Sequence, residues 1–154
     1  MLGRQGRLLV RPVAKENRLW SEWAMFLSQL TPPQQESFLQ LAAHLVAVDG
    51  VITPEEQNML AQLAVGAEDW VPQTALPVAS LVLAFDSSRS RAAALLELIG
   101  LAYADTVYAE EERAFIDDLA RRMEISPARV SLMESWVIRQ LALAEEGHAL
   151  LEGC

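Results

Sequence analysis

Acidic side chains recur at matching positions in two stretches of the chain that lie 56 residues apart. In each stretch an aspartate is followed by glutamates six and seven residues later. Carboxylate oxygens are the ligands that calcium, magnesium and manganese prefer in proteins. The sequence therefore predicts a candidate site for one of these divalent cations, formed by Asp49, Glu55, Glu56, Asp105, Glu111 and Glu112.

These carboxylates belong to a duplicated unit, since residues 41–64 correspond to residues 97–120. Each copy is expected to consist of a helix, an acidic turn and a second helix. If the copies pack about a pseudo-twofold axis, the two turns lie together, and crowded carboxylates raise one another's pKa unless a cation compensates. The turn is not an EF-hand, because Gly50, Val51 and Ile52 follow Asp49 and the alternating ligands of that loop are missing.

A purely structural interpretation explains the same residues. Glutamates in the first turn of a helix are favoured by the helix dipole, and aspartate before glycine is common in turns. In the first copy, Thr53, Pro54 and Glu56 have the pattern of an N-cap, a first-turn proline and a capping box. The cation site and the helix caps therefore both stand as interpretations of the acidic turns.

The elements that must position these turns are helices, because apolar residues recur at spacings of three and four and strand-like alternation is scarce. We expect an all-α, single-domain bundle. Start and stop signals predict about seven helices. They are a short helix carrying Trp20, Trp23, Leu27 and Leu30, a helix from Thr31-Pro32 to Asp49-Gly50, one after Thr53, a central buried one over Ala75 to Phe85, one over Ser90 to Ala104, one carrying Phe115 to Met123, and one from Ser126-Pro127 towards Gly147.

The pattern from Ala47 to Glu56, AVDGVITPEE, with its echo from Ala104 to Glu112, resembles the TerB-like family of bacterial tellurite-resistance domains. That family is related to a module of some membrane-anchored DnaJ co-chaperones. The resemblance covers roughly Gln34 to Leu141. It implies a helical bundle of duplicated origin, a bacterial stress-response setting, and a divalent-cation site at the acidic turns, with Asp49, Glu56, Asp105 and Glu112 as the matching residues.

The second copy departs from this pattern. Thr106 stands where the first copy has Gly50, Ala109 where it has the capping Thr53, and Glu110 where it has Pro54. A turn without glycine has less conformational freedom, so the second half of the site is expected to be distorted or merely structural.

Charge is unevenly distributed along the 154 residues, whose net charge is -9. Residues 1–18 hold five basic side chains against Glu16, whereas no lysine or arginine lies between Leu19 and Ser88. We expect a flexible basic arm over 1–18, a helical domain over 19–146 and a frayed tail over 147–154. The acidic body should repel nucleic acid and favour cations or a basic protein partner, and the arm leaves peripheral membrane association open.

Other features indicate no catalytic site. No apolar run is long enough to cross a bilayer, and the single cysteine, Cys154, requires no oxidising compartment, so a cytoplasmic protein is expected. His44 and His148 lack the spacing of a zinc site, and His44 is interpreted as a histidine at the edge of the core. Arg121 and Arg122 are expected to face solvent or to pair with the acidic side chains of Asp117 and Asp118. The serines Ser87, Ser88 and Ser90 have no glycine-rich context.

Three functions from different classes remain. The preferred one is a non-enzymatic TerB-like module that binds a divalent cation or an unidentified protein partner through the acidic turns. The alternative is a structural adaptor that docks a partner through the helix bearing Trp20 and Trp23, or through the basic arm. A metal-dependent hydrolase is third, because no general base, nucleophile or phosphate-binding lysine lies near the motif.

Overall fold

A computed structural model describes residues 26–48, 54, 60, 76–104 and 108–153. Its elements are one 3-10 helix and five α-helices, namely η2 (Leu27–Gln29), α2 (Pro32–Val46), α4 (Val78–Val82), α5 (Ser88–Ala104), α6 (Glu110–Arg122) and α7 (Pro127–Glu152). The described residues include no strand, which confirms the all-α class. The predicted total of about seven helices and the duplication stay predictions, because the rest of the chain, Trp20 and Trp23 included, lies outside these ranges.

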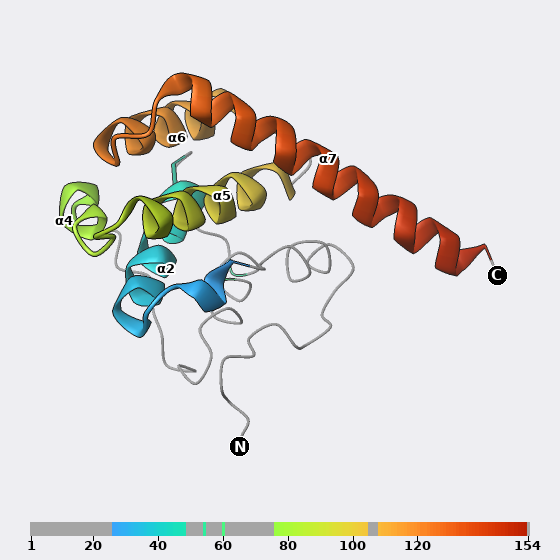
Figure 1. Cartoon of the computed structure of the whole chain (residues 1–154), viewed down its shortest axis with the longest axis horizontal. Helices are drawn as coiled ribbons and strands as arrows, with labels where there is room; N and C mark the ends of the chain where they lie inside the picture. Colours follow the sequence, from blue (N-terminus) through green and yellow to red (C-terminus); the bar gives the residue numbers. More distant parts are fainter. Residues whose placement is uncertain (1–25, 49–53, 55–59, 61–75, 105–107, 154) are drawn as a thin grey trace, which may run out of the picture.

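Helix α5 is the centre of the described structure. It lies between α2 on one side and α6 and α7 on the other (Figure 1), and it packs against each of them and against η2. Between Ala93 and Ala102 almost every side chain is buried, with Leu95, Leu98 and Ile99 completely enclosed. A helix that is apolar all round is stable only when neighbours cover every face, which is the position that α5 occupies.

The prediction of a central buried helix over Ala75 to Phe85 is wrong. Only Val78–Val82 forms a helix there, and this short α4 lies at the edge of the bundle (Figure 1). Leu81 and Val82 are buried, but 80% of Leu83 is exposed. The apolar run alone did not separate a buried helix from an edge helix, and Pro77, within the run, is the N-cap after which α4 begins.

Two helix starts follow the sequence signals. Thr31 caps α2, accepting a hydrogen bond from the backbone N–H of Gln34, while the Gln34 side chain accepts one from the N–H of Thr31. Ser126 caps α7 in the same way, accepting from the N–H of Arg129, with Pro127 in the first turn. These caps fix where the two helices begin and so set the register of the core residues that follow.

The end of α7 differs from the prediction. The helix continues through Gly147 to Glu152, so the segment expected to fray from 147 onward is helical up to that residue. A single glycine costs a helix about 1 kcal/mol, and the alanines, leucines and glutamates around Gly147 are strong helix formers that outweigh this cost. None of the described helices is long and apolar enough to cross a membrane.

Helix α6 ends with a residue in the left-handed region. Glu124 has φ of 62°, and the backbone N–H groups of Glu124 and Ile125 donate to the carbonyls of Arg121 and Ala120. This hydrogen-bond pattern is a Schellman motif, in which glycine is preferred at the position of Glu124.

Glu124→Gly should therefore stabilise the protein by about 0.5 kcal/mol, because relief of the left-handed strain exceeds the entropy that glycine adds to the unfolded chain. The side chain of Glu124 is exposed, and its contact with Arg91 spans 3.6 Å, so little is lost with it. Chemical denaturation of both proteins measures the difference. A less stable Glu124→Gly variant would contradict the prediction.

Candidate functional site

The second acidic turn leads into α6, whose first turn holds Glu110, Glu111 and Glu112. Glu112 Oε1 accepts a hydrogen bond from the backbone N–H of Ala109 at 3.0 Å, which is the glutamate half of a capping box. Glu110 and Glu111 are exposed at the same helix end. Glu112 therefore has a structural role, and of the two predicted ligands described here Glu111 is the one that is exposed.

Of the six predicted ligands, the structure describes only Glu111 and Glu112. Asp49, Glu55, Glu56 and Asp105 lie outside the described residues. Within the described ranges, no three acidic, histidine or cysteine side chains gather in a group that could hold a metal ion. The cation site thus stays a prediction that depends on the carboxylates of both turns.

One contact bears on whether the two acidic turns lie together. The ring of His44, near the end of α2, stacks on the ring of Phe115 in α6, with centroids 6.4 Å apart. His44 Nε2 also forms a 2.7 Å hydrogen bond with the backbone carbonyl of Leu76. His44 is half-buried, in agreement with its interpretation as a histidine at the core edge. This stacking joins the helix that precedes the first acidic turn to the helix that follows the second.

An aromatic and ionic cluster, which the sequence did not indicate, joins Tyr108 and the start of α6 to α7. The Tyr103 and Tyr108 rings have centroids 4.5 Å apart, and the Arg113 guanidinium lies 4.4 Å from the centroid of the Tyr108 ring. Glu134 of α7 accepts hydrogen bonds from the Tyr108 hydroxyl at 3.3 Å and from Arg113 at 3.4 Å. The available signal was the pair of tyrosines flanking the turn, but nothing in their spacing pointed to Glu134.

The environment of Tyr108 keeps its hydroxyl protonated. Burial of the phenol, followed by the nearby negative charge of Glu134, raises the pKa of Tyr108 above its usual range. The hydroxyl therefore remains a hydrogen-bond donor to Glu134 at physiological pH. This cluster ties Tyr108 and Arg113 to Glu134 of α7.

Glu97, in the middle of α5, is the most unusual ionisable group in the described structure. Its side chain is completely buried, Oε2 accepts a hydrogen bond from the backbone N–H of Phe26, and Oε1 has no hydrogen-bond partner among the described residues. Burial raises the pKa of Glu97 to about 8, although the hydrogen bond from Phe26 opposes the shift. Sequence analysis missed Glu97, because one glutamate in an apolar helix resembles a solvent-facing residue.

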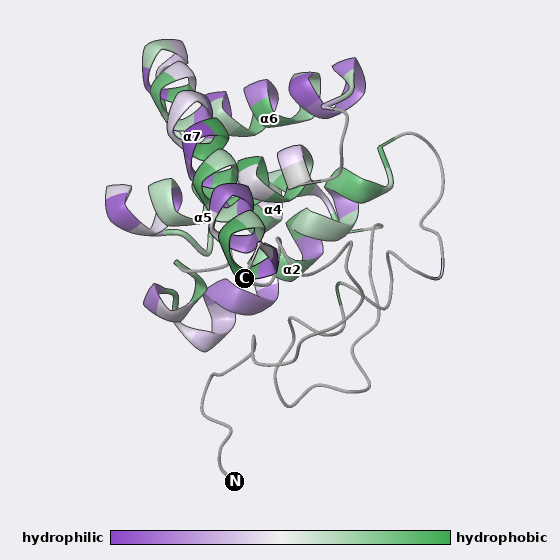
Figure 2. Ribbon diagram, turned by 90° about the vertical axis from the view of Figure 1, so that its right-hand side faces the viewer, coloured by the Kyte–Doolittle hydropathy of each residue, from purple (hydrophilic) through white to green (hydrophobic). Residues whose placement is uncertain are grey.

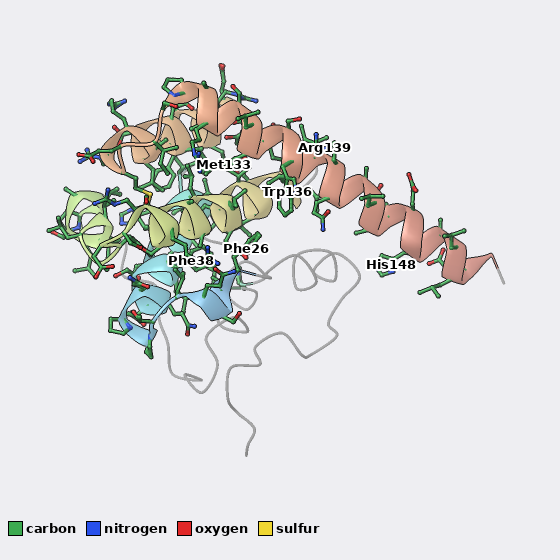
Figure 3. All side chains as sticks on the ribbon, viewed as in Figure 1. Phe26, Phe38, Met133, Trp136, Arg139 and His148 are labelled. Atoms are coloured by element: carbon green, nitrogen blue, oxygen red, sulfur yellow. The ribbon has the colours of Figure 1, made fainter. Side chains whose placement is uncertain are left out.

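The segment from Phe26 to Leu30, whose first residue donates the hydrogen bond to Glu97, has apolar neighbours. The Phe26 ring lies 5.8 Å from the Trp136 ring of α7, and the two side chains face each other in Figure 3. Leu27 and Leu30 of the same segment are buried. Leu27 and Leu30, the described end of the short helix predicted to carry Trp20 and Trp23, are thus part of the core. The Glu97 carboxyl is enclosed, so it offers no accessible reaction site.

The remaining candidate residues stabilise helices. Ser87 and Ser90 form a cap at the start of α5, with the N–H of Ser90 donating to Ser87 Oγ at 3.0 Å. Arg121 and Arg122 both pair with Asp118, as expected, and no ion pair with Asp117 is found in the described region. The hydrogen bond from Arg122 lowers the pKa of Asp118, and Arg121 adds to the effect.

Together, the fold and these contacts define an all-helical protein in which α6 begins with three glutamates. In comparisons with protein-family models, curated proteins and solved structures, no match to this chain was found.

Proposed function

We propose that this chain is a non-enzymatic, TerB-like helical module of a bacterial stress-response system, which binds a divalent cation through its two acidic turns and thereby presents an ordered acidic face to a basic protein partner. The stacking of His44 on Phe115 is the observation that carries this proposal. It joins α2, which precedes Asp49, to α6, whose first turn carries Glu111.

Chain connectivity supports the same arrangement. Asp49 lies three residues beyond Val46, the last residue of α2. His44 lies in the last turn of that helix. Glu111 lies four residues before Phe115, about one helical turn. From this connectivity we expect carboxylates of the two turns to lie close enough to share an ion. The 2.3–2.6 Å ligand distances of calcium, with its tolerance of irregular geometry, suit a site whose second half departs from the first better than octahedral magnesium does.

The described residues give little support to the other classes. Leu27 and Leu30 are core residues, so an adaptor surface on that stripe would have to rest on Trp20 and Trp23 alone. The described carboxylate with the most strongly raised pKa, Glu97, is enclosed. Catalysis by a buried group that no substrate reaches is not expected.

Calorimetric titration of chelator-treated protein with calcium, magnesium and manganese tests the proposal. We expect saturable binding by the wild type and at least a tenfold weaker affinity for Asp49→Asn plus Glu111→Gln, because each removed charge weakens attraction for the ion. Asp117→Asn, which neutralises an exposed carboxylate further along α6, is the matched control and should bind normally. Absence of binding by the wild type would reduce the acidic turns to helix caps.

A further inference from the structure

The C-terminal half of α7 extends beyond the other described helices (Figures 1 and 3). The buried residues of α7 are Val130, Met133 and Val137, all in its N-terminal half. From Ile138 to Gly153, every residue is exposed or only partly buried. The helix therefore continues for about four turns past the core that supports its beginning.

Apolar residues, coloured green in Figure 2, recur along α7, and several of them are exposed. Leu132, Leu143 and Leu151 are 70%, 59% and 74% exposed. At 100° per residue, Leu132, Leu143 and Leu150 fall on one stripe, with the half-buried Trp136 beside them. Leu151 borders the same stripe on its bundle-facing side. An apolar helix stripe that the bundle does not cover is typical of a helix-pairing surface.

Charge along one edge of the stripe identifies the occupant. Arg139 and Glu146 both border it on the same side and are seven residues apart. That separation is about 10 Å along the helix, too far for the two to pair with each other. Neither forms an ion pair within the described part of the chain. When two copies of this helix run antiparallel, Arg139 of each copy lies next to Glu146 of the other. The edge is therefore complementary in charge to the same edge of a second copy.

We propose that α7 pairs antiparallel with α7 of a second copy of this chain, about a twofold axis near residue 142, so that Arg139 of each copy faces Glu146 of the partner subunit. The same register places Leu132 opposite the end of the partner helix, near Leu151. It also places Trp136 opposite Ala149, two residues from Gly147, where the space at the Cβ position is open. The apolar and ionic contacts thus select one alignment.

The expected affinity is modest. Residues 132 to 151 correspond to about 30 Å of helix, and one helix on each side provides less than the roughly 800 Å² per partner of a standard stable interface. The net charge of -9 on each copy opposes association further. We therefore expect a weak dimer with a dissociation constant in the micromolar range or above.

Sedimentation velocity of the full chain over a range of concentrations tests the pairing. Arg139→Glu and Glu146→Arg alone should each weaken the dimer about tenfold, because each replaces two attractive pairs by two repulsive ones. The double variant Arg139→Glu plus Glu146→Arg restores both pairs in reversed orientation and should return the dissociation constant to within about threefold of wild type.

Leu143→Ser, on the stripe, should also weaken the dimer about tenfold. Ile138→Ser is its control, since Ile138 is 49% exposed but lies on the other side of α7, among the charged residues. These substitutions are at exposed positions, so far-UV circular dichroism should be unchanged. A wild type that is monomeric up to millimolar concentration, or a double variant that stays as weak as the single ones, would overturn the proposal. Because neither acidic turn is involved, the outcome is independent of cation binding.

Discussion

Wild-type protein should lose stability on the order of 3–5 kcal/mol between pH 5 and pH 9 through the titration of Glu97 alone. The carboxyl is completely buried in α5, and its pKa is raised from 4.5 to about 8 in the folded chain. Ionisation above that pKa places a negative charge in an apolar interior, where the Phe26 N–H is the one hydrogen-bond donor to it among the described residues. Charges in such surroundings are strongly destabilising.

The direction of this pH dependence follows from which state, folded or unfolded, binds more protons. Between pH 4.5 and pH 8 the folded state holds the Glu97 proton while the unfolded state has released it. The folded state therefore binds more protons in this window, and stability falls as pH rises. The contribution is fully present below pH 4.5 and is lost as pH increases through about 8. This is opposite to the behaviour of Asp118, whose pKa is lowered and whose contribution is lost in acid.

Urea denaturation at a series of pH values, on wild type and Glu97→Gln, measures the effect. The variant should be less stable than wild type at pH 5, because its amide places N–H donors where Glu97 Oε1 has no described partner. It should be the more stable of the two at pH 9, where only the wild type carries the buried charge. Glu111→Gln, an exposed carboxylate, serves as control and should follow the wild-type profile. Parallel profiles for wild type and Glu97→Gln would show that Glu97 is not responsible.

Local sequence signals predicted correctly the helices that begin with a capping residue followed by proline. Thr31 and Ser126 with their following prolines marked the starts of α2 and α7, and the spacing of Leu95, Ile99 and Ala102 gave the buried face of α5. What those signals lacked was the environment of each helix. Apolar runs at α4 and α5 look alike in sequence, and only packing shows that α5 is enclosed while α4 lies at the edge.

The candidate site could be predicted only as a set of residue types. The sequence indicated carboxylates at two turns, but it did not show that Glu112 caps Ala109 or that Glu134, 22 residues beyond Glu112, holds Tyr108 and Arg113 at the second turn. Such contacts depend on which faces of α5, α6 and α7 meet, and side-chain periodicity does not specify that pairing. The calorimetric titration proposed above tests whether Asp49 and Glu111 bind one ion together.

Phe38→Ala should destabilise the protein by about 3–5 kcal/mol, because it removes a large side chain and leaves a cavity that the neighbouring helices cannot fill. Phe38 is completely buried on the face of α2 that also carries Leu41 and Leu45. Figure 3 shows it pointing from α2 towards α5. A loss of this size would approach the full stability of a small domain.

Leu83→Ala is the informative comparison for Phe38→Ala. Both are large apolar residues in segments that the sequence predicted to be helical, but Leu83 is 80% exposed on the turn after α4. We expect Leu83→Ala to change the free energy of unfolding by less than about 0.5 kcal/mol. Urea denaturation at pH 6 compares the two variants with wild type. Equal losses for both would mean that α4 is enclosed as the sequence suggested, whereas a large loss confined to Phe38→Ala would place the core between α2 and α5.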